Sequence, residues 1–249
     1  MSVTPPTRAR RGVKLAEQLA QEIVAQISQS GMKAGDRLQS ELLMAQQRGV
    51  SRASLREALR ILEVHGLITI RTGPNGGPEL AELTARDFSR MATLHFNAAG
   101  VTFRELLEAR VVLEPRMAEL AAVNRTPQQM LALRSNVREH RRADDLVELV
   151  RYAHDFHELV ADMAGTDNRA LSLMTASIHG IFDVYLHRGR SVEAMQSTAG
   201  VHAEISDAIE EGDAERAASL MESHMQASAD TFERENPTLI DQTVSWLST

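Results

Sequence analysis

Three histidines, each on a different expected helix, are the residues of this sequence best suited to metal chemistry. They are His157, His202 and His224. Neutral imidazoles that converge inside a helical bundle can bind a divalent cation such as Zn²⁺ or Ni²⁺. Spacing alone leaves another interpretation open, because an isolated histidine on a helix usually lies at the surface or forms a hydrogen bond within the protein.

Two arginines one helical turn apart are the residues best suited to binding nucleic acid. Arg52 and Arg56 lie near the start of an expected helix. Ser51 is its expected N-cap, and Ser54 is small, so the helix start can approach a DNA backbone and offer its N–H groups to a phosphate. The arginines can then reach the major groove. The alternative is a solvated helix face with glutamate partners.

The elements that position these arginines follow a winged helix-turn-helix order. Apolar residues at helical spacing predict three helices, and a β-branched segment followed by glycines predicts a strand and a hairpin. The helices span 14–29, 40–47 and 52–65, the strand 67–71 and the hairpin 72–78. A sharp turn at Gly49 separates the last two helices, and the hairpin around Gly73 could lie along the neighbouring minor groove.

The histidines lie in a longer segment with a different pattern. Beyond residue 79 the strand signals end, and amphipathic helices with short connections predict an antiparallel helical bundle. The expected helices span 85–97, 102–123, 126–143, 146–164, 168–188, 193–211 and 214–234. The expected fold class is therefore mainly α, with an N-terminal winged helix-turn-helix followed by an all-α bundle.

The charge distribution separates the same two parts. The chain of 249 residues has a net charge of −7, but residues 1–78 carry 11 Lys or Arg against 6 Asp or Glu, whereas residues 79–249 carry 16 against 28. A basic head on an acidic body indicates that one domain meets phosphate. We expect a DNA-binding domain at 1–80, an effector-binding and dimerisation domain at 81–238, and a C-terminal tail at 239–249.

The composition excludes several classes of protein. Cysteine is absent, which removes disulfide frameworks and thiolate metal sites. No run of about 18 apolar residues is present, and Glu17 and Glu22 interrupt the apolar N-terminal stretch that a signal peptide would need. The sequence therefore predicts a cytoplasmic protein without a membrane span.

Three segments of the head resemble the GntR family of bacterial regulators. They cover residues 35–41, 49–59 and 62–68. The resemblance implies that Arg52 and Arg56 contact DNA and that Gly73 is the wing glycine.

Two positions of the head depart from the family pattern. In the family a proline follows the leucine at Leu38, and an arginine that often contacts DNA follows the glutamate at Glu41. This chain has Gln39 and Leu42 there instead. These departures put in question a match between the operator and the common family consensus, and they do not affect the expected fold.

The body resembles the FCD ligand-binding domain of the FadR subfamily. The matching segments are 110–115, 155–157, position 202 and 212–224. In metal-binding members of that subfamily, three histidines at the positions of His157, His202 and His224 are joined by an aspartate one turn before the first. Here that position is Ala153, and the nearby Asp155 points to a different side of the helix.

The missing aspartate leaves two possibilities for the body. Either a three-histidine site is completed by water or by an effector carboxylate, or the pocket has lost its metal and binds its effector through apolar and polar contacts. Arg110 could add charge complementarity to an acidic effector, or it could form a salt bridge with a nearby glutamate such as Glu114.

Together these features predict a transcriptional regulator rather than an enzyme. We expect a homodimeric repressor that binds a pseudo-palindromic operator in double-stranded DNA and responds to a small-molecule effector. The resemblance implies an organic acid or an acyl-CoA thioester as the effector. The alternative function is a metal-dependent hydrolase that uses the three-histidine site, although it leaves the basic head without a role.

Overall fold

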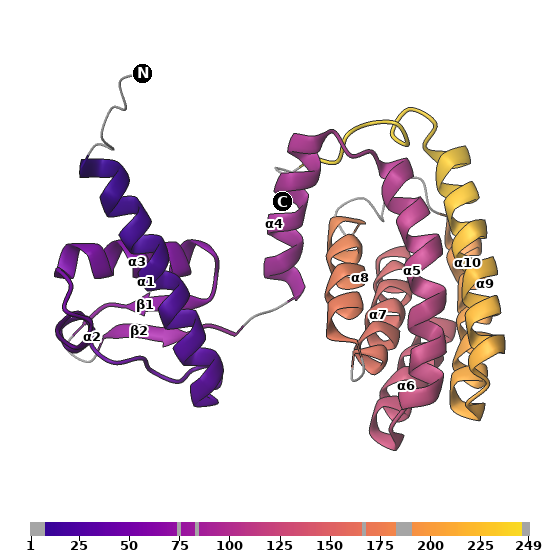
Figure 1. Ribbon diagram of the computed structural model, residues 1–249. Coiled ribbons are helices and arrows are strands. Elements are labelled where there is room, and N and C mark those ends of the chain that lie inside the picture. Colours follow the sequence, from indigo (N-terminus) through magenta and orange to yellow (C-terminus); the bar gives the residue numbers. More distant parts are fainter. Residues whose placement is uncertain (1–7, 74–75, 83–84, 166–167, 183–190, 246–249) are drawn as a thin grey trace. The chain divides into compact units, whose positions relative to one another are not determined.

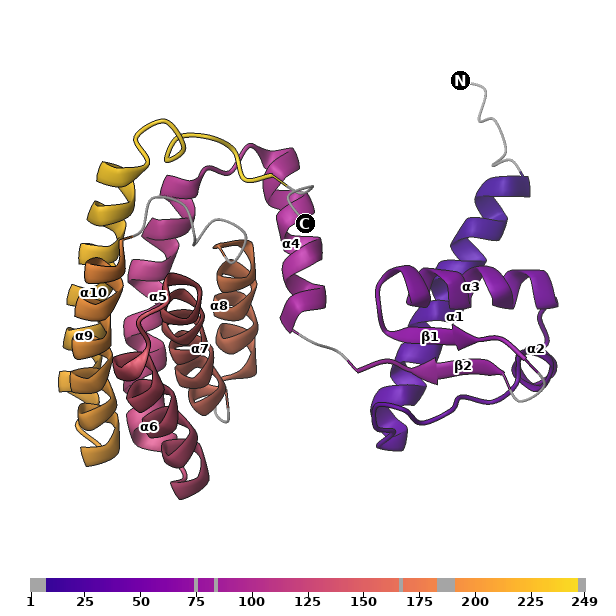
Figure 2. The same ribbon diagram turned by 180° about the vertical axis from the view of Figure 1, so that it is seen from behind.

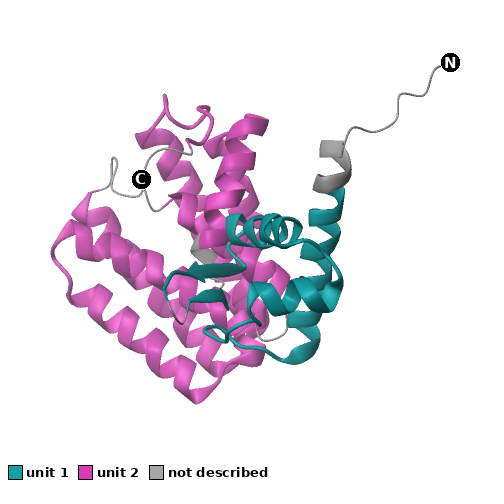
Figure 3. Ribbon diagram, turned by 90° about the vertical axis from the view of Figure 1, so that its left-hand side faces the viewer, with its two compact units in different colours: residues 1–84 teal, residues 85–249 magenta. Residues whose placement is uncertain are grey.

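The computed structural model describes residues 8–73, 76–82, 85–165, 168–182 and 191–245 (Figures 1 and 2). The chain divides into two compact units, residues 1–84 and 85–249 (Figure 3). This division lies close to the expected boundary after residue 80, and the expected domain limits themselves stay a prediction. Three expected features extend beyond the described residues, namely the hairpin at its tip (74–75), the helix expected over 168–188 in its last part, and the tail expected at 239–249 in its last four residues.

The first unit packs three helices and a two-stranded wing around one core (Figure 1). Its elements are α1 (Arg8–Ser30), α2 (Glu41–Arg48), α3 (Arg52–Val64), β1 (Ile68–Arg71) and β2 (Gly77–Leu80). The strands pair antiparallel, with Ile68 opposite Leu80 and Arg71 opposite Gly77. Apolar residues from the helices and from β1 share the core, which includes Ile23, Leu55, Leu59 and Ile68.

Local residues set the geometry of the helix-turn-helix. Ser40 and Ser51 are the N-caps of α2 and α3, and the hydroxyl of each accepts a backbone N–H of the first turn. Gly49 ends α2 at φ 63°, a left-handed conformation that glycine adopts without a steric cost. The chain therefore turns sharply, and α3 begins at Arg52 with its first residues exposed.

The second unit is an antiparallel helical bundle (Figures 1 and 2). Its helices are α4 (Ala85–Ala99), α5 (Phe103–Asn124), α6 (Pro127–Arg142), α7 (Leu146–Ala164), α8 (Arg169–Phe182), α9 (Val192–Glu211) and α10 (Ala214–Glu235). α5 packs against α7, α8, α9 and α10, so several helices can direct side chains toward it. The expected winged helix-turn-helix and all-α bundle are both confirmed.

The residues after α10 pack against the bundle. Ile240 and Val244 are buried, and the N–H groups of Phe103 and Arg104 donate to the carbonyls of Gln242 and Ile240 at 3.2 and 2.9 Å. The described part of the segment expected as a tail therefore completes the core around the start of α5. None of the helices that the structure describes is long and apolar enough to cross a membrane.

Candidate functional site

The two arginines expected to contact DNA are exposed near the start of α3. Arg52 begins the helix, and Arg56 follows one turn later with 64% of its side chain exposed. Arg56 Nε donates to Glu41 Oε2 at 2.8 Å. Because the arginine of this ion pair is largely exposed to solvent, a DNA phosphate can replace the carboxylate as its partner.

The small residues around these arginines occupy the positions that the sequence indicates. The Ser51 hydroxyl accepts the Ser54 N–H at 3.1 Å, and the two hydroxyl groups lie 2.9 Å apart. Gly73 follows β1 and has φ 109°, where most side chains would be strained. Contacts of Ser51, Ser54, Arg52, Arg56 and Gly73 with DNA stay predictions.

The three histidines singled out in the sequence meet inside the second unit. His157 comes from α7, His202 from α9 and His224 from α10. His224 Nε2 lies 3.0 Å from His202 Nε2 and 3.4 Å from His157 Nε2, and the three possible ligand atoms lie within 4.8 Å of one another. Tetrahedral zinc with Zn–N bonds of about 2.0–2.1 Å would hold its ligand atoms about 3.3 Å apart. The residues present therefore fit a divalent cation.

Burial keeps two imidazoles of this cluster, those of His157 and His202, uncharged. Removal from water lowers the pKa of His157 to about 4, although the neighbouring Glu114 works in the opposite direction. Burial, followed by the nearby rings of His224 and His157, holds the pKa of His202 well below its usual value. Neutral imidazole is the metal-binding form, so His157 and His202 are in that form near neutral pH.

A buried carboxylate on α5 holds one side of the cluster. Glu114 Oε1 accepts from Arg110 Nε at 2.6 Å and from His179 Nε2 at 3.0 Å, and its Oε2 lies 2.5 Å from His157 Nδ1. Burial by itself raises the pKa of Glu114, but Arg110 and the two histidines outweigh it and hold that pKa well below its usual value. Since an ionised carboxylate only accepts hydrogen bonds, His157 carries its proton on Nδ1 and His179 on Nε2.

The proton position on His157 suits a metal ligand. With Nδ1 protonated, Nε2 has a lone pair, and this is the atom that faces His224. Carboxylate–histidine pairs of this kind orient metal-binding rings and raise their basicity. Glu114, His157 and His179 are also close enough to hold an ion. The guanidinium of Arg110 beside Glu114 opposes a cation there, so we interpret that group as a hydrogen-bond network.

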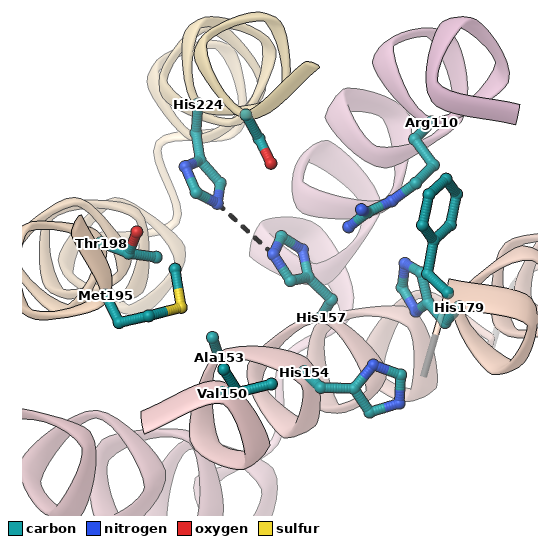
Figure 4. Close-up of a pocket in the computed structure, with 11 residues that line it drawn as sticks. Arg110, Val150, Ala153, His154, His157, His179, Met195, Thr198 and His224 are labelled. Atoms are coloured by element: carbon teal, nitrogen blue, oxygen red, sulfur yellow. Dashed lines mark hydrogen bonds between the residues drawn. The ribbon is translucent and has the colours of Figure 1, made fainter. Parts of the chain in front are cut away.

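A cavity lies against the network (Figure 4). Figure 4 shows Arg110 and His224 pointing toward His157 from different helices. Ala153 also lines the cavity, four residues before His157 on α7 and hence on the same helix face. Its methyl group leaves space where an aspartate would reach the cluster. The cavity volume of about 40 Å³ is enough for a few water molecules or a small ligand group.

Arg110 forms the salt bridge considered from the sequence. It is 7% exposed, forms the salt bridge with Glu114 and lies 5.4 Å from the centroid of the Phe182 ring. It also lines the cavity, so a contact with an acidic effector stays a prediction.

Two features of the site were missed by sequence reasoning. The first is the part that Glu114 plays in holding His157, and the second is the participation of His179. The salt bridge between Arg110 and Glu114 was considered from the sequence, and their spacing of four favours it, but this spacing does not indicate a contact of Glu114 with His157. Nothing in the sequence distinguished His179 from the remaining histidines.

Comparison with known proteins yields matches for both units. Residues 15–74 match the bacterial regulatory proteins of the gntR family, and residues 105–227 match the FCD domain. The HTH-type transcriptional regulator Mce2R of Mycobacterium tuberculosis is 32% identical over 175 residues, which cover 67% of this chain and 68% of the relative. The Exu regulon transcriptional regulator of Escherichia coli is 28% identical over 231 residues, 91% of this chain and 85% of the relative. The solved structure of a Streptococcus agalactiae GntR protein is 25% identical with a TM-score of 0.63, and the match covers 86% of this chain and 99% of that one.

Proposed function

The chain belongs to the gntR family of bacterial regulatory proteins and carries an FCD domain, and we propose that this DNA-binding transcriptional regulator is a homodimeric repressor released by a small organic acid. One observation carries the proposal. A buried three-histidine cluster lies beside a cavity, in the same chain as a helix-turn-helix with exposed arginines. A regulator of this kind acts where the chromosome lies, in the bacterial cytoplasm.

The proposed DNA contacts follow from the exposure of α3. Arg52 and Arg56 would enter the major groove, Ser51 and Ser54 would bring the helix start against a phosphate, and Gly73 would let the wing approach the backbone. One such head covers one half-site. Two copies of the chain would therefore read a pseudo-palindromic operator.

The proposed effector site follows from the position of Ala153. His157, His202 and His224 would hold a Zn²⁺ or Ni²⁺ ion, and Ala153 leaves a coordination position open. A metal bound there supplies positive charge for an effector carboxylate. Arg110 adds a second positive charge at the wall of the same cavity. The small cavity favours a short organic acid over an acyl-CoA thioester.

Release from DNA would follow from different affinities of the acid for two conformations of the bundle. The acid would contact residues from α5, α7 and α10, and it would favour the arrangement that suits these contacts best.

The hydrolase alternative gains no support, because the matched relatives are named transcriptional regulators. In addition, the carboxylate of Glu114 is not available as the general base of a hydrolase, because it is already paired with Arg110, His157 and His179.

Genome-wide footprinting followed by gel-shift titration tests the proposal. Footprinting identifies the operator, and the genes beside it suggest which acids to add. We expect salt-sensitive binding to that duplex and its loss when the acid is added. Protein that shows no salt-sensitive preference for any duplex over polyanion competitors would overturn the regulator function. Elemental analysis tests the metal, since His157→Ala protein with the metal content of the wild type would contradict the histidine site.

A further inference from the structure

Leu42 is an exposed apolar residue near the start of α2. It is 52% exposed, although residues 1–78 carry 11 Lys or Arg against 6 Asp or Glu and form a basic unit. Single apolar residues are common on protein surfaces, so exposure by itself assigns no role to this leucine. What distinguishes Leu42 is its place among the residues proposed to contact DNA.

Two contacts hold the start of α2 beside α3 and the wing. Glu41, the residue before Leu42, accepts from Arg56 Nε at 2.8 Å. The chain that leads into α2 lies against the wing, since the N–H of Leu38 donates to the carbonyl of Pro78 at 2.9 Å. Consecutive Cα atoms are about 3.8 Å apart, so the side chain of Leu42 begins next to the residue that Arg56 reaches.

The edges of base pairs offer one group that suits a leucine. In the major groove they present hydrogen-bond donors and acceptors, and their apolar group is the 5-methyl of thymine. A leucine can neither donate nor accept a hydrogen bond, so its contact with a donor or acceptor would displace water without replacing the lost bond. Contact with the thymine methyl group instead removes apolar surface of both partners from water.

Building on the proposed DNA contacts of α3, we propose that Leu42 packs against the 5-methyl group of a thymine in the operator half-site. Arg52 and Arg56 supply positive charge and hydrogen-bond donors from α3, and Leu42 adds selectivity for one base pair from α2. An arginine at this position would select guanine, because its guanidinium donates to O6 and N7 of that base. The leucine of this chain selects thymine instead.

Replacement of single thymines by deoxyuridine tests the proposal on the unchanged protein. Uracil lacks the 5-methyl group and keeps the hydrogen-bonding groups of thymine. Operator duplexes obtained by genome-wide footprinting would carry the replacement at one thymine at a time. In gel-shift titrations of the full-length protein, we expect the loss of the contacted methyl group to weaken binding about 4-fold. Equal affinity for the thymine duplex and for every uracil duplex would overturn the contact.

A double-mutant cycle assigns the methyl contact to Leu42. Because this residue is exposed, Leu42→Ala leaves the core of the unit intact. We expect the variant to bind the thymine duplex and the uracil duplex with a ratio of about 1. Val64→Ala is the matched control, since Val64 is 71% exposed at the end of α3, and it should keep the preference of the wild type. A Leu42→Ala protein with the full preference for thymine would assign the contact to another residue and overturn the proposal.

Leu42→Arg should reverse the preference at the same position. We expect this variant to bind a duplex with guanine there more tightly than the thymine duplex. A Leu42→Arg protein that still preferred thymine would contradict the assignment of this position to Leu42.

The outcomes separate this proposal from the function on which it rests. Wild-type binding that is salt-sensitive and indifferent to every thymine methyl group would overturn the role of Leu42 and leave the regulator function in place. Protein without a salt-sensitive preference for any duplex would contradict both.

Discussion

Nδ1 of His157 lies 2.5 Å from Oε2 of Glu114, and both side chains are buried. The carboxylate holds the proton on that nitrogen, so the opposite ring nitrogen presents its lone pair to the histidine cluster. The charge of Glu114 is balanced within the protein by Arg110, whose Nε lies 2.6 Å from Oε1. The cluster therefore depends on a residue that is not one of its ligands.

Removing this carboxylate should weaken metal binding while all three ligand histidines remain. We expect Glu114→Gln to raise the dissociation constant for Zn²⁺ about 10- to 100-fold, because the ring of His157 loses its orienting partner. Competition with a chromophoric chelator measures this constant. Glu119→Gln is the matched control, since Glu119 lies on the same helix in an exposed ion pair with Arg116.

A double variant separates lost orientation from lost folding. Glu114→Gln leaves Arg110 buried without its charge partner, which can destabilise the bundle. Arg110→Met combined with Glu114→Met removes both charges, and such apolar replacements of a buried pair are often tolerated. Unchanged affinity for Zn²⁺ in the folded double variant would contradict the orienting role of Glu114.

Restoring an aspartate at position 153 should complete the ligand set. Ala153 and His157 share one face of α7, so the carboxylate in Ala153→Asp can reach the cluster. We expect tighter Zn²⁺ binding by chelator competition and weaker binding of organic acids by calorimetry, because the new side chain takes the open coordination position. Val147→Asp, on an exposed part of the same helix, is the control. An Ala153→Asp protein with unchanged affinities for both would show that this position does not face the bound metal.

The helices could be predicted because their signals are local. The capping box of α5, in which Thr102 and Glu105 satisfy each other's backbone groups, is visible as a four-residue pattern. The same holds for the turn at Gly49, which separates two short apolar stripes. Such features depend on neighbouring residues alone, so expected and observed helix ends differ by only a few residues across most of the described chain.

The network behind the histidines could not be predicted in the same way. Glu114 and His179 are 65 residues apart, and their contact depends on how α5 packs against α8. Periodicity places each residue on a helix but does not say which helices face each other. Resemblance to a known domain brought His157, His202 and His224 together, and it gave no reason to add His179.

Arg56 should matter for operator binding although it is paired with Glu41 in the free protein. We expect Arg56→Ala to weaken binding to the operator by about 1 to 3 kcal/mol in gel-shift titrations, because a direct base or phosphate contact is lost. The exposed Arg116→Ala, on α5, should leave binding unchanged. Glu41→Gln should keep or strengthen binding, since Arg56 no longer has to leave a carboxylate. Wild-type affinity in Arg56→Ala would remove this arginine from the DNA contacts.

Histidines buried in the neutral form should make the fold sensitive to acid. Burial lowers the pKa of both His140 and His157 to about 4, whereas a histidine in the unfolded chain titrates at about 6.5. The unfolded chain therefore takes up protons first as the pH falls. The free energy of unfolding should be highest above about pH 6.5 and should decline between about pH 6.5 and 4, with a contribution of up to about 3 kcal/mol from each histidine.

Urea unfolding of the chelator-treated protein at about pH 7.5, 6 and 5 measures this decline. Glu114 does not contribute in that range, because a carboxyl with a lowered pKa loses its stabilising effect only below its ordinary value of 4.5. His140→Leu removes one titrating ring, which packs 5.4 Å from the ring of His202, and keeps all three cluster ligands, so its unfolding free energy should depend less on pH. The exposed His65→Gln should follow the wild type. If wild type and His140→Leu lost stability equally between pH 7.5 and 5, the uncharged state of His140 in the fold would be contradicted, because the leucine variant has no proton to gain at that position.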